Sequence, residues 1–365
     1  MTPIRVLHAV DSMTGGGAQQ VVLDLAAWAD DNGVGVAILG GRGGRSADIA
    51  PGAEFIPVAG QSFLHYLVAL ARACRAFRPT VLHAHQRREA LACLVVGRLL
   101  RIPVVEHAHT VLPSRRMRAL SFRSRRIFSV GPSVTRMLHD GFGVPASKID
   151  TVGNLVPSAA FAPPATTTPV VDRLRRDGER IILGVGRLEE QKDPERFVSI
   201  VAALGGGARG IWFGDGPLRT EMEQLIASEN APVVLAGRSA TVVDEMTAAD
   251  CLLLTSRWEG TPLVVLEAFA RGLPVVAVGA PGVPELVGGR GELIDDAATP
   301  REAAEVVRRA LSSRSDGPRR AAREYAENHA DPDVVYAPVL AAYRALAGRR
   351  HRFGPIGPRR GGVAR

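Results

Sequence analysis

Short apolar runs alternate with longer segments of helical period along the first part of the chain. The apolar runs stand at Ile4–Val10, Val34–Leu39, Val81–Ala84, Val104–Glu106 and Arg126–Val130. Segments with a helical period lie between them, at about 17–30, 63–77, 87–100 and 114–124. The runs are continuously apolar, which is typical of strands buried on both faces. This order predicts a parallel sheet covered by helices on both faces.

A segment rich in proline, threonine and alanine, residues 153–178, interrupts this alternation and shows no clear period. The alternation then resumes, with predicted strands at Arg180–Val185, Gly210–Phe213, Pro232–Leu235, Cys251–Leu254, Pro274–Val278 and Glu292–Ile294. Two further helical patterns follow, at about 300–311 and 332–347. We therefore predict an α/β protein with two Rossmann-like, doubly wound parallel-sheet domains, whose strands point their carboxyl ends at a central cleft.

These patterns divide the chain of 365 residues into four parts. The predicted parts are a first domain at 1–153, a linker at 154–179, a second domain at 180–348 and a basic, disordered tail at 349–365. No apolar run reaches the roughly 18–20 residues that span a bilayer, and the first residues read as a strand rather than a signal peptide. We therefore expect a cytoplasmic protein. The three cysteines lie far apart in apolar surroundings and are expected to be core residues.

Charge is distributed unevenly along the chain. Residues 1–153 hold 18 lysines and arginines against 10 acidic residues, residues 154–348 hold 21 against 27, and the tail adds six arginines and no acid. The basic first half and tail suit an anionic partner, such as a membrane surface or a phosphorylated acceptor, although a solvated basic face is an equal alternative. Between Pro113 and Arg126 the chain has six arginines and no acid. This segment is open to three interpretations: an amphipathic helix on an anionic membrane, an anionic acceptor site or a solvated helix.

A glycine-rich loop follows the first predicted strand. Gly15, Gly16 and Gly17 stand between that strand and an amphipathic helix, where backbone N–H groups could approach a phosphate. The loop lacks the third glycine of a dinucleotide-binding fingerprint, because Gln20 occupies that position, and the chain has no P-loop motif. A glycine-rich turn without a ligand is the alternative.

Two histidines, His107 and His109, follow a strand that is predicted to end at Glu106. Beyond a strand end such a pair need not converge, and no acidic residue or cysteine is placed to complete three metal ligands. We therefore predict no metal site, and we expect a polar group at the mouth of the cleft. A structural histidine is the alternative.

Two cations follow the first strand of the second domain. Arg187 comes directly after Gly186, and Lys192 precedes a helix whose start is marked by Asp193 and Pro194. Only two of the 45 basic residues are lysines, so a retained lysine marks a place for a compact charge. Two cations at the carboxyl end of a strand favour an anion such as a diphosphate. The alternative is a surface pair with Glu189 or Glu190.

Two glutamates, Glu259 and Glu267, flank the predicted start of another helix. Thr261 and Pro262 are predicted as its N-cap and first residue, so that Glu259 lies in the loop before it and Glu267 about two turns along it. Both carboxylates can then face one groove, and each can accept hydrogen bonds from two sugar hydroxyls. The alternative is an ion pair of Glu267 with Arg271 one turn later.

Together these segments resemble glycosyltransferase family 4, whose members are retaining GT-B enzymes. The resemblance runs over nearly the whole chain, through GGGAQ, EHAH, VGRLEEQKDPERFV, FGDGPLR and SRWEGTPLVVLEAFARG. Two glutamates separated by seven residues, with an arginine and a lysine five residues apart ahead of them, form its most specific part. The glycine loop alone would not identify the family.

The resemblance assigns a role to each candidate residue. Catalytic roles fall to Arg187 and Lys192, which would neutralise the donor diphosphate, to His107, which would lie near the reacting sugar, and to Glu259, which would hold sugar hydroxyls. Donor-binding roles fall to Gly15 and Gly16 at the diphosphate, to Gly260, Thr261 and Leu263 at the sugar, to Glu267 at the ribose and to Arg238 near the base. Members of the family work without a bound metal or other cofactor.

The resemblance therefore implies a retaining transferase that moves a sugar from a UDP- or GDP-sugar to an acceptor hydroxyl. The acceptor could belong to a polysaccharide, a glycolipid or a secondary metabolite. The arginine-rich, lysine-poor composition points to a bacterium, and the enzyme would be cytoplasmic or peripheral at the membrane. The alternatives are a GT-B-like sugar-nucleotide epimerase and a nucleic-acid-binding protein. The scarcity of aromatic residues and the acidic second half count against a nucleic-acid groove.

Overall fold

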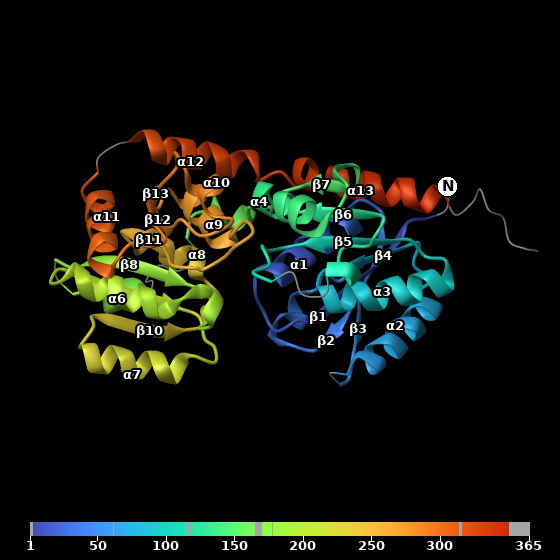
Figure 1. Ribbon diagram of the computed structural model, residues 1–365, viewed down its shortest axis with the longest axis horizontal. Helices are drawn as coiled ribbons and strands as arrows, with labels where there is room; N and C mark the ends of the chain where they lie inside the picture. The colour runs from blue at the N-terminus through green and yellow to red at the C-terminus, as the bar shows by residue number, and fades with distance from the viewer. Residues whose placement is uncertain are drawn as a thin grey trace, which may run out of the picture.

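The computed structural model describes residues 3–60, 62–114, 118–164, 170–176, 178–313 and 316–349. They form two lobes, each built on a parallel sheet (Figure 1). The expected tail from residue 350 onward lies outside the described residues, as do Arg115 and Arg116 of the basic segment.

The first sheet has seven parallel strands. In spatial order they are β3 (Glu54–Pro57), β2 (Gly35–Gly41), β1 (Arg5–Ser12), β4 (Val81–Ala84), β5 (Val104–Ala108), β6 (Arg126–Ser129) and β7 (Ile149–Thr151). The sequence pattern predicted five of them and missed β3 and β7. Both are edge strands of four and three residues, and β7 (Ile-Asp-Thr) has no apolar run from which it could be recognised.

The second sheet has six parallel strands, and all six were predicted. In spatial order they are β10 (Val233–Gly237), β9 (Ala208–Phe213), β8 (Arg180–Val185), β11 (Cys251–Leu254), β12 (Val275–Val278) and β13 (Glu292–Ile294). The inner strands β11 and β12 are fully buried, whereas the edge strands β10 and β13 are partly exposed. The three cysteines are buried free thiols, as expected.

Helices cover both sheets and supply most of the core. Those on the first sheet are α1 (Gly17–Asp31), α2 (Phe63–Phe77), α3 (Arg87–Leu100), α4 (Pro132–Arg136) and α13 (Pro332–Arg349). Those in the second lobe are α5 (Val170–Leu174), α6 (Pro194–Leu204), α7 (Arg219–Glu229), α8 (Val242–Glu245), α9 (Leu263–Arg271), α10 (Pro284–Val287), α11 (Pro300–Ser312) and α12 (Asp316–Asn328). Among the described residues, no helix is both long and apolar enough to cross a membrane.

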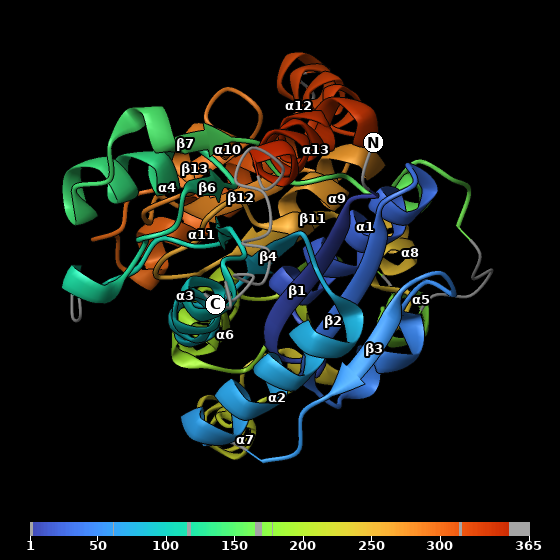
Figure 2. The same ribbon diagram turned by 90° about the vertical axis from the view of Figure 1, so that its right-hand side faces the viewer.

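The last helix differs from the expected domain division. Although α13 follows the second sheet in the chain, its apolar side chains belong to the core of the first domain, where Tyr343 and Val339 are fully buried. Its end lies at the far side of the first lobe (Figures 1 and 2). The chain therefore crosses between the lobes twice, and the two crossings touch where the N–H of Val156 donates to the carbonyl oxygen of His329. A helical pattern alone cannot reveal which sheet a helix covers.

The helix predicted at about 114–124 is also wrong. Within the described residues of that segment, the only helical turn is a short 3₁₀ turn at Arg118–Leu120. Arg118, Ala119 and Leu120 are exposed, so this turn buries no apolar face against the domain that could stabilise a longer helix.

Candidate active site

The candidate residues gather where the strand order reverses in each sheet. Strand order turns between β1 and β4 in the first sheet and between β8 and β11 in the second. Open parallel sheets bind ligands outside the carboxyl ends of strands at such points. The glycine loop follows β1, Arg187 and Lys192 follow β8, and Glu259 follows β11. Three loops from distant parts of the sequence therefore lie where a ligand-binding cleft is expected.

The glycine loop opens α1 without a side-chain cap. Gly15 and Gly16 have φ values of 127° and 134°, which side-chain-bearing residues rarely adopt. Gly16 is the N-cap of α1 and supplies no side-chain hydrogen bond, so the first N–H groups of the helix are available to an anion. A Cβ at Gly17 would lie 3.6 Å from Leu263 Cδ1, so the start of α1 lies against the start of α9 in the other domain.

Sequence analysis missed a cation beside this loop. Arg45 belongs to a 3₁₀ turn, Gly44–Asp48, that follows β2. Its Cγ lies 4.0 Å from the position of a Cβ at Gly15, and its guanidinium donates to Gln20 Oε1 at 2.7 Å and pairs with Asp48. The signal was visible as an arginine among glycines directly after a predicted strand. Arg45 can add positive charge to the glycine side of the cleft.

Lys192 and Glu259 form an ion pair in the second domain. Lys192 Nζ donates to Glu259 Oε1 at 2.6 Å, and the exposed fractions of the two side chains are 19% and 7%. The stem of Lys192 packs over Gly186, where its carbons lie 3.1–3.2 Å from the position of a Cβ. A lysine ammonium has three donors, so Lys192 keeps donors for an anion while it holds Glu259. Sequence analysis selected both residues but did not predict their pairing.

Arg187 is placed differently from Lys192. Its guanidinium pairs with Glu189, which is the surface pairing that sequence analysis kept as the alternative. More than half of the Arg187 side chain is exposed. An exposed pair of this kind contributes about 0–1 kcal/mol, so Arg187 can leave Glu189 for a stronger anion at little cost. The helix start predicted at Asp193 and Pro194 is confirmed, since Asp193 is the N-cap of α6 and accepts from the N–H of Arg196.

The loop that carries Glu259 is held by the first domain. Thr110 forms a bridge with Gly260, and the N–H of Val111 donates to the carbonyl oxygen of Glu259 at 3.2 Å. Asn154 Nδ2 donates to the carbonyl oxygen of Thr261 at 2.7 Å. Gly260 admits no side chain there, because a Cβ would lie 2.2 Å from the carbonyl oxygen of His109.

The helix after this loop begins later than predicted. Thr261 is not its N-cap: α9 begins at Leu263 with Pro262 as N-cap, and no side chain caps it. Thr261 Oγ1 instead donates to the carbonyl oxygen of Val130 in the first domain. The uncapped N–H groups of α9 therefore face the start of α1, and both helices present positive ends to the same region.

Glu267 lies on α9 as predicted, and its pairing with Arg271 is not found. Arg271 instead pairs with Asp244 at 3.1 Å. Burial raises the pKa of Glu267 to about 7, and the charge of Asp24 on α1 adds to the effect. Burial likewise raises the pKa of Asp24 to about 6. Two carboxyl groups, one from each domain, therefore titrate near neutral pH on facing helices.

Five histidines stack on one face of three neighbouring strands. His8 on β1 is in register with His83 on β4, and His85, His107 and His109 continue the stack along β4 and β5. Neighbouring ring centroids lie 4.3–5.7 Å apart. Because β5 runs on to Ala108, His107 lies inside the strand, and His107 and His109 share a face; the expectation that they need not converge is wrong.

Hydrogen bonds satisfy only half of the ring nitrogens in this stack. His85 bonds His8 and His109, each at 3.0 Å, and His83 bonds the hydroxyl of Tyr343 at 2.6 Å. Both nitrogens of His107 are buried without a partner, as is one nitrogen each of His8, His83 and His109. Burial lowers the pKa of every ring, to about 3 for His8 and about 4 for His109, so the imidazoles are neutral at pH 7.

The stack supplies the third potential metal ligand, another histidine, that the sequence analysis did not find. Ligand atoms of His85, His107 and His109 lie within 4.8 Å of one another, and so do those of His8, His83 and His85. Neutral imidazole is the form that binds transition metals. A strand period of two, with histidines in three neighbouring strands, was the available signal. The prediction that the protein works without a metal stays a prediction.

Arg238 lies apart from these groups in the sheet order. It follows Gly237 at the carboxyl end of the edge strand β10, two strands from β8. Its side chain is exposed and has no ion-pair or hydrogen-bond partner among the described residues. A free guanidinium at this edge can accept a flat or anionic group, such as a nucleobase.

Comparisons with known proteins agree with this geometry. A family model described as glycosyl transferases group 1 matches residues 170–329, and one described as glycosyltransferase family 4 matches residues 15–159. The two matches adjoin and together cover most of the chain. The chain belongs to glycosyltransferase family 4. It is therefore a glycosyltransferase, as the residues of the cleft predicted.

Named relatives of this family 4 glycosyltransferase include enzymes of several pathways. The putative glycosyltransferase EpsF of Bacillus subtilis is 26% identical over 302 residues, which are 74% of this chain and 78% of EpsF. The sulfoquinovosyl transferase SQD2 of Arabidopsis thaliana is 30% identical over 58% of this chain, and the 2-deoxystreptamine glucosyltransferase of Streptomyces kanamyceticus is 31% identical over 46%. These two matches span less than half of the relatives' own length, at 45% and 46%.

Solved structures of similar fold cover nearly the whole family 4 chain. HepE of Anabaena, in complex with UDP and glucose, superposes with a TM-score of 0.80 at 18% identity, over 94% of this chain and 100% of that one. WaaG, a glycosyltransferase involved in lipopolysaccharide biosynthesis, superposes with a TM-score of 0.72 at 17% identity over the same shares. These likenesses confirm the GT-B fold.

Proposed function

We propose that this glycosyltransferase takes its sugar from a nucleoside-diphosphate donor and transfers it with retention of configuration to an acceptor hydroxyl. The observation that carries the proposal is the meeting of two uncapped helix starts, at Gly16 and Leu263, beside Lys192. Helix N-termini and the half-buried ammonium of Lys192 are suited to a diphosphate. Sugar hydroxyls and ribose require acceptors instead, and Glu259 and Glu267 supply them.

The donor would lie with its diphosphate between the two domains. Lys192, Arg187 and the N–H groups of α1 and α9 would face the phosphates, with Gly15 and Gly16 allowing close approach. Glu259, Gly260, Thr261 and Leu263 would surround the sugar, and Glu267 would accept from the ribose hydroxyls. Arg238 would lie near the base, on the edge strand. HepE was solved with UDP and UDP-glucose, which supports UDP as the first donor base to test.

The reaction breaks the bond from the anomeric carbon to the diphosphate and forms a bond from that carbon to the acceptor oxygen. Negative charge grows on the leaving phosphate, and preorganised cations stabilise it at the transition state. Glu259 is engaged by Lys192, so it does not serve as a free nucleophile. We therefore favour attack by the acceptor oxygen on the same face of the sugar from which the diphosphate leaves. The acceptor proton would pass to an oxygen of the leaving phosphate. His107 and His109 would line the acceptor side. Trapping a covalent sugar on Glu259 would refute this mechanism.

The acceptor is proposed only by class. Relatives named for 2-deoxystreptamine glucosylation, sulfoquinovosyl transfer and teichuronic acid biosynthesis support a small aglycone, a glycolipid or a polysaccharide precursor. The geometry of the cleft does not distinguish these three classes, because each needs to place only one hydroxyl beside the transferred sugar. A panel of the three acceptor classes, each with radiolabelled donor, would separate them.

Thermal shifts with nucleotides test the donor proposal directly. UDP, GDP, ADP and dTDP, and their sugar conjugates, are added to the full chain with and without EDTA. A ligand at 100 times its Kd adds about 2.7 kcal/mol to the unfolding free energy, which is a readable shift. We expect one base to give a selective shift that Glu267→Ala weakens and the exposed control Arg301→Ala does not. No shift with any nucleotide would contradict the proposal.

A further inference from the structure

The histidine stack has five ring nitrogens that are buried without a partner among the described residues. They are both nitrogens of His107 and one nitrogen each of His8, His83 and His109. A buried polar atom without a hydrogen bond costs about 1–3 kcal/mol, and most buried polar atoms in folded proteins therefore have a partner. Five such atoms on one face of a sheet indicate a ligand that binds several imidazoles at once.

Three of the five histidines meet at the carboxyl edge of the first sheet. His85 directly follows β4, His109 directly follows β5, and His107 is the last residue but one of β5. His85 and His107 are buried, whereas His109 is partly exposed. An ion can therefore enter beside His109 and keep a water molecule there. We call His85, His107 and His109 the outer group.

The rings of the outer group are spaced for a common metal ion. Nδ1 of His85 lies 3.0 Å from Nε2 of His109. Two nitrogens bound at 2.0–2.1 Å to one tetrahedral Zn²⁺ lie about 3.4 Å apart, so these two need to separate only slightly. Each of the three residues offers a ligand atom within 4.8 Å of the other two. Because the χ2 torsion of histidine has a broad minimum, the His107 ring can turn toward the ion at little cost.

His8 is placed to orient one of these ligands. Nε2 of His85 lies 3.0 Å from Nδ1 of His8. When the proton of His85 is on Nε2, that nitrogen donates to His8, and the lone pair of Nδ1 is available to a metal. Metal-bound histidines generally donate their second N–H to such a partner, which fixes the ring and its tautomer. His85 therefore has both the free nitrogen and the orienting contact of a metal ligand.

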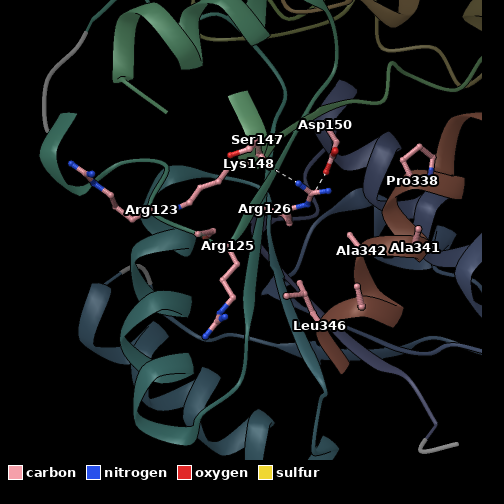
Figure 3. Close-up of a pocket in the computed structure, with 12 residues that line it drawn as sticks. Arg123, Arg125, Arg126, Ser147, Lys148, Asp150, Pro338, Ala341, Ala342 and Leu346 are labelled. Carbon is pink, nitrogen blue, oxygen red and sulfur yellow. Dashed lines mark hydrogen bonds and ion pairs between the residues drawn. The ribbon is translucent and has the colours of Figure 1, made fainter. Parts of the chain in front are cut away.

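The inner end of the stack is closed by α13. His83 bonds the hydroxyl of Tyr343 at 2.6 Å, and both side chains are fully buried. Other residues of α13 line a pocket on the outside of the domain, where arginine side chains point away from one another (Figure 3). Among the described residues that line this pocket, the one carboxylate is Asp150, which pairs with Arg126 at 3.2 Å. This side of the domain therefore offers a metal neither ligands nor entry, which favours the outer group over the inner one.

We propose that His85, His107 and His109 bind one divalent transition-metal ion such as Zn²⁺, with water in the fourth position. Sequence analysis predicted no metal site because a third ligand was lacking, and His85 supplies it from the neighbouring strand. Three imidazoles without a carboxylate suit Zn²⁺, Ni²⁺ or Cu²⁺ and not Mg²⁺. The ion would tie the ends of β4 and β5 together and would not be a cofactor of the transfer, so the proposal does not depend on the donor or the acceptor.

Titration with Co²⁺ tests the site in the absence of donor and acceptor. The full chain, without a histidine tag, is dialysed against EDTA and freed of chelator before Co²⁺ is added. We expect one Co²⁺ per chain, with the intense visible absorption of a four-coordinate ion, which Zn²⁺ displaces and Mg²⁺ does not. Zn²⁺ should also raise the melting temperature, because it binds the folded chain. Absence of the four-coordinate spectrum in the wild-type protein would overturn the proposal, whatever the variants show.

Three variants assign the ion to its ligands. His109→Gln removes the partly exposed ligand, and in EDTA it should melt as the wild type does. Loss of a partner behind a metal ligand costs 10–100-fold in affinity, so loss of the ligand itself should weaken Co²⁺ binding by at least about 100-fold. His83→Phe changes the inner group alone, and His139→Gln changes an exposed histidine elsewhere on the domain. Both should keep the Co²⁺ spectrum.

Two patterns among the variants would overturn the assignment. Binding that is kept in His109→Gln and lost in His139→Gln would show adventitious binding at the surface. Binding that is kept in His109→Gln and lost in His83→Phe would place the ion in the inner group of His8, His83 and His85.

Discussion

Thr261 Oγ1 donates a 2.6 Å hydrogen bond to the carbonyl oxygen of Val130, from the second domain to the first. Together with Asn154 and the bridge between Thr110 and Gly260, it fixes the loop that carries Glu259. The residues that would hold the sugar are thus positioned by the domain that would hold the acceptor. The position of the loop that carries Glu259 therefore depends on how the two domains are arranged.

We predict that Thr261→Val weakens donor binding by roughly tenfold. Valine keeps the shape of threonine but leaves the Val130 carbonyl oxygen without its partner, which costs about 1–3 kcal/mol when that oxygen is buried. Thr261→Ser keeps the hydroxyl and should bind donor almost as the wild type does. Calorimetric titration with the nucleotide identified by thermal shift measures both. Equal affinities of the valine and serine variants would show that this contact does not position the loop.

Lys192→Met should lower kcat/KM by about 10²–10³, or ~3–4 kcal/mol, as expected for loss of one preorganised charge at the leaving group. The same change leaves Glu259 buried and unpaired, which costs a further 3–5 kcal/mol of stability. The double variant Lys192→Met/Glu259→Gln separates these effects, because it removes both charges together. We expect it to recover much of the melting temperature and none of the activity. Recovery of turnover would show that Lys192 only neutralises Glu259.

Arg187→Ala should also lower kcat/KM by 10²–10³, but without the loss of stability. Its present partner is Glu189, and more than half of its side chain is exposed. Removing it therefore leaves no buried charge. Unchanged melting with a large loss of turnover would support a role at the diphosphate. Near-normal turnover would instead show that Arg187 serves only in its surface ion pair with Glu189.

The sequence pattern predicted most strands of this protein, but it did not predict the contacts between its two domains. The run Arg180–Val185 predicts a buried strand because the five residues after Arg180 include no polar side chain, which is local information. The hydrogen bond between Thr261 and Val130 joins residues 131 positions apart across two domains, and no local pattern encodes how the domains face each other. The same holds for α13, whose apolar face is visible in the sequence but whose partner sheet is not.

In the candidate site, too, the sequence predicted individual residues but not how they contact one another. Lys192 was found as a rare lysine after a predicted strand, and Glu259 and Glu267 were found because they stand beside and inside an apolar helix, where an unpaired charge would be costly. Their pairing could not be predicted, since it depends on how the loops after β8 and β11 approach each other. His8, His83 and His85 were missed because each is one polar residue in an apolar strand. They become a group only through the register of β1 and β4.

Donor affinity should rise with pH through neutrality. Burial raises the pKa of Glu267 to about 7, so below that pH the group is a neutral acid in the free protein. Ribose hydroxyls donate more strongly to a carboxylate, so ionisation favours binding. We expect the Kd for the nucleotide to fall between pH 6 and pH 8. Glu267→Gln should bind more weakly and flatten this dependence; an unchanged profile in that variant would assign the titration to another group, with Asp24 the first candidate.

The histidine stack should make the first domain sensitive to acid. The unfolded chain binds protons at these rings below a pKa of about 6.5, whereas burial keeps the folded pKa of His8 near 3 and that of His109 near 4. Stability is therefore complete above pH 6.5 and falls as the pH drops toward these values, by up to ~1.4 kcal/mol per pH unit for each histidine. His8→Phe should reduce the slope of unfolding free energy against pH, and the exposed control His139→Gln should not. Equal slopes in the three proteins would show that the stack is not the acid-sensitive element.

Removal of divalent metal should leave turnover unchanged. Lys192, Arg187 and two helix N-termini supply the positive charge that a metal would otherwise bring to a diphosphate. The histidine stack makes this prediction worth testing, because His85 belongs to both groups of three potential ligands. Enzyme dialysed against EDTA should keep its rate, and added Zn²⁺ or Co²⁺ should not raise it. If chelation stops turnover and Zn²⁺ restores it, His85→Gln should abolish that rescue, and the metal-independent mechanism would have to be replaced by one with a metal in the stack.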